Sequence, residues 1–153
     1  MNDEYYMMLA IEEAQNAQKI DEVPVGAVIV DEDHQVIGRG FNRPISNQDP
    51  TSHAEINAIR RACDRLNNYR LPHTSLYVTI EPCIMCMGAI IHARIGRVVF
   101  GAPDPKWGAA VSLYRMASDH RLNHSPEIVS GICEEETKAL IKGFFRKKRR
   151  HRD

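Results

Sequence analysis

Two short segments of this chain, residues 53–55 (His-Ala-Glu) and 82–86 (Pro-Cys-Ile-Met-Cys), place the strongest constraint on its fold. Each comes directly before a segment whose apolar residues have helical spacing. The 26 residues between them (56–81) have room for the rest of one helix, a loop and a strand. If both helices begin at the same end of a sheet, His53, Cys83 and Cys86 come together there.

The residue types in these segments are those that hold a metal ion. Cys83 and Cys86 are three positions apart, so they share one face of a helix, and His53 supplies a third ligand. The softness and geometry of this ligand set favour zinc. Three protein ligands leave the fourth position of a tetrahedral zinc site open for water, as in catalytic sites. The helix N-termini also favour the thiolate form of cysteine. We therefore expect one zinc ion per subunit.

Glu55 follows the expected ligand His53 by two residues and does not need to bind the metal itself. A carboxylate in that position can take a proton from the activated water and pass it to a leaving group. We therefore expect Glu55 to be the catalytic proton carrier.

Two other interpretations of these residues are weaker. A C-x-x-C pair is also typical of redox proteins, but that hypothesis gives His53 no role. A structural zinc site would need a fourth ligand. Cys63 lies about 15 Å along the helix that begins near His53, at 1.5 Å per residue, which is too far to bind the same ion.

The pattern of apolar and turn-forming residues predicts an α/β fold. We expect helices over residues 4–19, 53–66, 82–93 and 134–148, a short helix within 104–116, and strands over 23–30, 36–41, 75–80, 95–101 and 127–129. Thr51 or Ser52 is expected to cap the second helix, and Pro82 to lie in the first turn of the third. This order predicts three α/β/α layers, in which a central mixed sheet of about five strands has helices on both faces.

Length and composition indicate a globular protein. The 153 residues fit one domain, residues 1–153, with a basic C-terminal helix and tail from about residue 144. No apolar run approaches the roughly 20 residues of a membrane span. The N-terminal MNDEYYMM lacks the basic region of a signal peptide, so we expect a cytoplasmic protein with no membrane partner.

The net charge of zero hides an uneven distribution. Residues 146–153 (RKKRRHRD) contain six Lys or Arg and one Asp, a formal charge of +5, so the other residues sum to −5. A basic run beside Phe144 and Phe145 is typical of segments that bind nucleic acid. A solvated helix end, with one of the two phenylalanines in the core, fits the same residues.

The motif H-x-E…P-C-x-x-C, which residues 53–86 match, is the signature of the zinc nucleobase deaminases. From about Tyr5 to Arg149 the chain resembles one branch of them, the bacterial tRNA-specific adenosine deaminases. The segments that carry this narrower resemblance are residues 23–27, 40–45, 49–56, 81–89, 91–95, 98–102, 108–110 and 144–146. The resemblance implies a cytidine-deaminase-like fold and conversion of adenosine to inosine at the wobble position of a tRNA anticodon stem-loop.

The resemblance also implies roles for residues outside the zinc motif. Asn42 would bind the target nucleoside, and Val25, Ala27, Glu81 and Pro82 would form walls of the base pocket. The remaining expected RNA contacts are Asp104, Lys106, Asn123, Phe144, Phe145 and Arg146. Taken without the resemblance, Asn42 and Asp104 are equally typical of turns. A homodimer is implied as well, with Met87 to Arg94 as the expected interface, although a helix buried in its own core has the same pattern.

Two alternatives to a tRNA deaminase remain open. A deaminase of cytidine, deoxycytidylate or guanine would share the zinc ligands and Glu55 but would not need the basic C-terminal helix. A non-catalytic RNA-binding module with a structural zinc ion would not need Glu55. In the loop that is expected to contact RNA, Pro105 and Trp107 depart from the family pattern. The tail beyond Arg149 is also longer than the family pattern requires.

Overall fold

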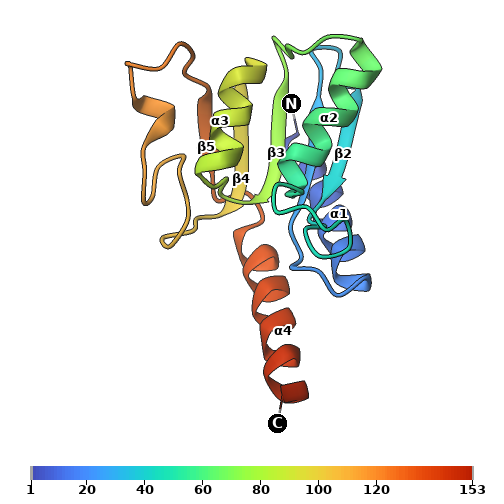
Figure 1. The fold of residues 1–153 in the computed structure, drawn as a ribbon. Helices are drawn as coiled ribbons and strands as arrows, with labels where there is room; N and C mark the ends of the chain where they lie inside the picture. The colour runs from blue at the N-terminus through green and yellow to red at the C-terminus, as the bar shows by residue number, and fades with distance from the viewer. Residues whose placement is uncertain (1, 153) are drawn as a thin grey trace.

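The computed structural model describes residues 2–152, and side chains through residue 150 (Figure 1). Five strands form one mixed sheet in the order β2-β1-β3-β4-β5. β1 is antiparallel to both β2 and β3, whereas the pairs β3–β4 and β4–β5 are parallel. The strands are β1 (Gly26–Val30), β2 (Val36–Phe41), β3 (Ser75–Ile80), β4 (Arg97–Ala102) and β5 (Glu127–Ser130).

Helices cover both faces of this sheet, which confirms the predicted three layers. The helices are α1 (Asp3–Lys19), α2 (Ala54–Leu66), α3 (Ile84–Ala93) and α4 (Glu134–Arg152), with a 3-10 turn at Met116–Ser118. Alternate residues of β1 point to opposite faces. Ala27 and Ile29 pack in a cluster with residues of α2 and α3, whereas Val28 and Val30 pack with α1, and Leu140 of α4 joins that second cluster.

α2 lies close against β2 because Gly40 has no side chain. A Cβ at Gly40 would lie 2.5 Å from both the carbonyl oxygen of Ala54 and the amide nitrogen of Ala58. The close approach fixes where α2 begins relative to the end of the sheet, and α2 carries the first half of the expected site.

α4 packs against the sheet only through its first part and then extends beyond it (Figure 1, red). Phe144 is buried, and Lys148 forms an ion pair with Asp21 beyond the C-terminal end of α1. Arg146 and Lys147 are exposed. The last expected tail residue, Asp153, lies outside the described residues. Among the described helices, none is both long enough and apolar enough to cross a membrane.

Several local predictions were wrong, most of them at element ends. β4 begins at Arg97 instead of residue 95. β1 begins at Gly26 instead of residue 23, because Pro24 has no N–H and the amide of Val25 bonds to Val23 in a tight turn. Neither Thr51 nor Ser52 caps α2: the N-cap residue is His53. Pro82 precedes Cys83, the N-cap of α3, and so lies outside the helix. The short helix expected within 104–116 is a 3-10 turn that begins only at Met116.

Candidate active site

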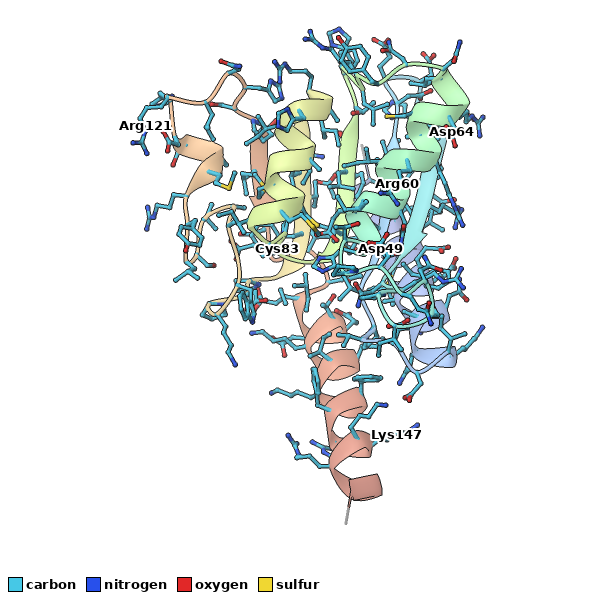
Figure 2. The ribbon with its side chains drawn as sticks, in the orientation of Figure 1. Asp49, Arg60, Asp64, Cys83, Arg121 and Lys147 are labelled. Carbon is cyan, nitrogen blue, oxygen red and sulfur yellow. The ribbon has the colours of Figure 1, made fainter. Side chains whose placement is uncertain are left out.

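His53, Cys83 and Cys86 meet where α2 and α3 begin. His53 and Cys83 are the N-cap residues of the two helices, and both have an extended backbone (φ −77° in each case). Neither side chain caps its own helix, so both are free to turn toward each other. Nδ1 of His53 lies 3.6 Å from Sγ of Cys83 and 3.6 Å from Sγ of Cys86. The three ligand atoms therefore surround one small volume (Figure 2 labels Cys83).

This geometry fits a tetrahedral zinc ion. With Zn–N of about 2.0–2.1 Å and Zn–S of about 2.3 Å, tetrahedral angles place nitrogen and sulfur about 3.6 Å apart. That separation is the one observed between His53 and each cysteine. The pKa of Cys83 is lowered to about 4, mainly because its sulfur accepts a hydrogen bond from Cys86, which in turn has a raised pKa. The donor set is thus in place for a metal that binds thiolate.

Glu55 lies in the first turn of α2, next to these ligands, and is only 4% exposed. Burial is the main cause of its raised pKa, which is about 7. A carboxyl group with such a pKa can both accept and donate a proton near neutral pH. Glu55 is not one of the three clustered ligand residues, and its side chain is buried beside them.

A cavity of about 830 Å³ opens over His53, Cys83 and Glu55. Its walls come from the segment before β1, the loop after β2, the end of β3, the first turn of α3, the loop after β4 and one face of α4. The wall residues include Val23, Val25, Asn42, Pro50, Asp104, Lys106, Trp107, Lys138, Ile141, Lys142 and Phe145. The volume is sufficient for a nucleoside and leaves the cavity open to a larger substrate.

Glu81 holds the loop after β4 in place. One carboxylate oxygen accepts hydrogen bonds from the amides of Ala110, Val111 and Ser112 at 2.9–3.2 Å. The other accepts from the amide of Asp104 at 3.0 Å and from the Ser112 hydroxyl. Burial alone would raise the pKa of Glu81, but these hydrogen bonds outweigh it and the pKa is lowered. The expected wall residue is therefore also the anchor of a wall loop.

Glu22 anchors the loop after β2, a role that the sequence did not indicate. It is 1% exposed, and its carboxylate accepts hydrogen bonds from the amides of Ile45 (3.3 Å) and Ser46 (2.7 Å). The only sign of this role in the sequence was that Glu22 directly precedes the apolar run 23–30. A carboxylate in that position is also typical of a surface turn. Two buried glutamates thus anchor two of the loops that form the cavity.

The structure separates the other expected substrate residues into two groups. Val25, Asn42, Glu81, Asp104, Lys106 and Phe145 line the cavity. Ala27 does not, because it is wholly buried between the sheet and α2. Pro82 is buried outside the cavity lining, and Phe144 is a core residue at 6% exposure beside the 44% exposed Phe145. Asn123 and Arg146 also lie outside the cavity lining.

α4 contributes three cavity residues that the sequence did not single out: Lys138, Ile141 and Lys142. Together with Phe145 they recur at intervals of three, one and three residues, which is the spacing of one helix face. Helical periodicity could have grouped them. Nothing in the sequence showed that this face would be turned toward residues 53–55.

Comparison with known proteins gives one consistent result. Residues 1–102 match the family model for the cytidine and deoxycytidylate deaminase zinc-binding region. A tRNA-specific adenosine deaminase from Haemophilus influenzae is 48% identical over 147 residues, which are 96% of this chain and 85% of that protein. One from Agrobacterium fabrum is 48% identical over 145 residues, 95% of each chain.

A solved structure from a study of A-to-I editing by tRNA:A34 deaminases at the wobble position of transfer RNA has the same fold. It matches with a TM-score of 0.86 and 47% identity, over 89% of this chain and 98% of the other. The fold, the zinc ligands and Glu55 define a zinc-dependent deaminase of the cytidine and deoxycytidylate deaminase class. Within that class, the chain belongs to the family of the tRNA-specific adenosine deaminases.

Proposed function

We propose that this protein hydrolyses adenosine to inosine at the wobble position of a tRNA anticodon, with release of ammonia. The observation that carries the proposal is the position of Glu55, His53 and Cys83 on the floor of an open cavity whose rim bears Lys106, Lys142 and Phe145. Because its substrate is tRNA, we place the reaction in the cytoplasm. The chain acts as a single deaminase domain.

The chemistry follows from the floor of the cavity. His53, Cys83 and Cys86 would hold the zinc ion, which when bound would lower the pKa of a water molecule beside the substrate. The Glu55 carboxylate takes a proton from the attacking water and delivers it to N1 of adenine. It then carries the second proton to the amine at C6, so that one water is consumed and one ammonia leaves. The buried position of Glu55 at the start of α2, beside the three ligands, suits both transfers.

The rim supports an RNA substrate. Anticodon loops are single-stranded, so a base can be turned out of the stack at modest cost and its neighbours stacked on aromatic rings. Phe145 and Trp107 are exposed at the cavity, and Lys106, Lys138 and Lys142 lie beside them. Asn42 would bind the target nucleoside and Asp104 its neighbour. Asn123 and Arg146 would contact the RNA beyond the cavity, and buried Phe144 would hold Phe145 in place.

A homodimer is supported by apolar residues at the N-terminus of α3 and in the loop after β4. Apart from Trp107 at the cavity, the large apolar side chains exposed there among the described residues are Ile84, Val111, Leu113 and Tyr114. The expected interface, Met87 to Arg94, is mostly turned inward, since Met87, Ile90, Ile91 and Ala93 are buried against the protein's own sheet. We therefore place the dimer contact at the start of α3. Sedimentation of wild type beside Ile84→Asp tests it, and a wild-type monomer would contradict it.

The proposed reaction is tested with a short anticodon stem-loop that carries adenosine at the wobble position. Wild type and Glu55→Ala are assayed on this RNA, with free adenosine, cytidine and guanine as parallel substrates. We expect inosine in the RNA with wild type alone, while Glu55→Ala keeps its zinc and its RNA affinity. Turnover of a free base or nucleoside, without inosine in the RNA, would instead assign a small-molecule deaminase. RNA binding without any turnover would assign the non-catalytic module.

A further inference from the structure

A second, smaller cavity of about 180 Å³ lies between α2 and the edge strand β2, outside the zinc site. Its walls come from the end of β2 (Phe41), the following loop (Arg43 and Asn47) and the exposed face of α2 (Asn57, Arg60 and Arg61). The α2 residues are spaced three and four positions apart, so they share one face of the helix. Three guanidinium groups therefore surround one small cavity.

Two of these guanidinium groups, those of Arg43 and Arg61, are held by contacts and still have donors to offer. Nε of Arg43 donates to the Ser46 hydroxyl at 3.3 Å, and its guanidinium lies over the Phe41 ring, 5.2 Å from the centroid. Nη1 of Arg61 donates to the carbonyl oxygen of Arg39 at 3.2 Å. Each guanidinium has five N–H donors. These contacts hold the side chains in place and leave most of their donors for a ligand.

The negative charge near the three arginines is too small to balance them. Among the described residues, the one carboxylate paired with any of the three is Asp49, at 3.8 Å from Nη1 of Arg60 (both labelled in Figure 2). That distance is beyond a hydrogen bond. Asp49 instead accepts hydrogen bonds from the Thr51 hydroxyl (2.7 Å) and the Thr51 amide (2.9 Å). The cavity thus keeps a local positive charge.

The loop of residues 42–53 separates this cavity from the zinc site and contributes to both. Asn42, Pro50 and His53 line the large cavity, whereas Arg43 and Asn47 line the small one. Asn57 ties the two edges of the loop together, because its Nδ2 donates to the carbonyl of Phe41 at 2.9 Å and to the Ser52 hydroxyl at 3.1 Å. Neighbouring residues of one anchored loop therefore face the target nucleoside and the arginines.

We propose that Arg43, Arg60 and Arg61 form a binding site for a backbone phosphodiester of the RNA substrate, on the strand that continues from the target nucleoside. The proposal rests on the proposed function. Guanidinium groups match the oxygens of a phosphodiester with paired N–H donors, which a lysine side chain does not do. A phosphate held here would fix the direction in which the RNA leaves the large cavity. The zinc chemistry itself does not need it.

The test compares wild type with the double variant Arg60→Gln/Arg61→Gln, on the anticodon stem-loop at several salt concentrations. Glutamine keeps the helix propensity and removes two charges from the exposed face of α2. The matched control is Arg65→Gln, since Arg65 is exposed on the same helix but lies outside the cavity lining. Zinc content and thermal stability are measured for each variant to show that the site and the fold are intact.

We expect KM for the RNA to rise on the order of tenfold in the double variant while kcat stays within about twofold. The slope of log KM against log salt should fall by about 0.7 to 0.9 for each phosphate that the variant no longer binds. Arg65→Gln should behave as wild type.

Three outcomes separate this site from the proposed function. Unchanged KM and salt slope in the double variant, with wild type active, would overturn the phosphate site and leave the proposed function standing. An equal effect of Arg65→Gln would also overturn the site, by showing a general charge effect. No inosine with wild type would refute the proposed function itself.

Discussion

The carboxyl group of Glu81 occupies the space that a side chain at position 108 would need. A Cβ added to Gly108 would lie 2.5 Å from Oε1 of Glu81 and 2.5 Å from the carbonyl oxygen of Asp104. Both distances are well below van der Waals contact. Because Gly108 has no side chain, the carboxyl group of Glu81 can be buried against it. The loop after β4 therefore returns over the end of β3 and forms one wall of the cavity.

Gly108→Ala is therefore expected to displace this loop without disturbing the metal. We expect kcat/KM on the anticodon stem-loop to fall by about tenfold or more, since Asp104 and Lys106 move with the loop, while bound zinc stays at one ion per subunit. Activity and zinc content are measured together. The control is Gly96→Ala, where the added Cβ would be 3.5 Å from the Thr74 carbonyl oxygen, an ordinary contact. Full activity of Gly108→Ala would show that the loop adapts.

Glu81→Gln is expected to destabilise the protein as well as weaken activity. The carboxylate accepts five hydrogen bonds from the loop, and an amide NH₂ cannot accept those that reach one of its two oxygens. Leaving buried N–H groups unpaired costs about 1–3 kcal/mol. Urea unfolding should show a decrease of that size relative to wild type. Glu12→Gln, the same substitution at an exposed position of α1 away from the cavity, serves as the control. Equal stability of wild type and Glu81→Gln would contradict the anchoring role.

Removal of a zinc ligand is expected to abolish activity, whereas removal of another cysteine is not. Cys86→Ala should lose the metal and all deamination, because only His53 and Cys83 remain as ligands. Cys63→Ala should keep both, since Cys63 packs against the core outside the ligand cluster. Metal content by mass spectrometry and inosine formation check this. Treatment of wild type with a chelator should mimic Cys86→Ala, and added zinc should restore activity. If Cys86→Ala retained zinc, Cys86 would not be a zinc ligand.

The ion pair of Asp3 and Arg97 is expected to make stability depend on acid pH. Arg97 donates to both carboxylate oxygens, at 2.8 and 2.7 Å, and Tyr77 donates to one of them at 2.7 Å. The Arg97 hydrogen bonds are the main reason that the pKa of Asp3 lies below its usual value. A carboxyl group with a lowered native pKa stabilises the fold above its unfolded pKa of about 3.9, and this contribution disappears as the pH falls through the native pKa.

Urea unfolding of wild type and Asp3→Asn at pH 7 and pH 3 checks this prediction. The wild type should be more stable by about 1–3 kcal/mol at pH 7, and the difference should shrink at pH 3. Asp64→Asn, on an exposed position of α2, controls for the general effect of removing a carboxylate. A difference of the same size at both pH values would show that the charge of Asp3 is not what stabilises the fold.

Local patterns were sufficient for most of the fold. The strands over residues 36–41 and 75–80 were predicted with the observed bounds of β2 and β3, because each follows a segment of turn-forming residues that marks where a strand can begin. Element ends were predicted less well. His53 is the N-cap residue of α2, and its side chain lies against Cys83, which is 30 positions away in the sequence. Local patterns do not contain a contact over that separation. Likewise, the loop over 104–112 is held by Glu81, not by its own propensity.

The ligand set of the zinc site could be predicted from the amino-acid sequence alone. Cysteines at i and i+3, a histidine, and a carboxylate two residues after it indicate three ligands and a candidate proton carrier, because spacing within a segment is preserved on folding. Which residues surround these groups depends on the tertiary structure. Lys138 and Lys142 reach the cavity, and Ala27 and Phe144 do not, because strand alternation and helix packing over long separations settle which face of each element turns toward the site. The smaller cavity with Arg43, Arg60 and Arg61 also depends on the tertiary structure, because its residues come from the end of β2, the following loop and α2.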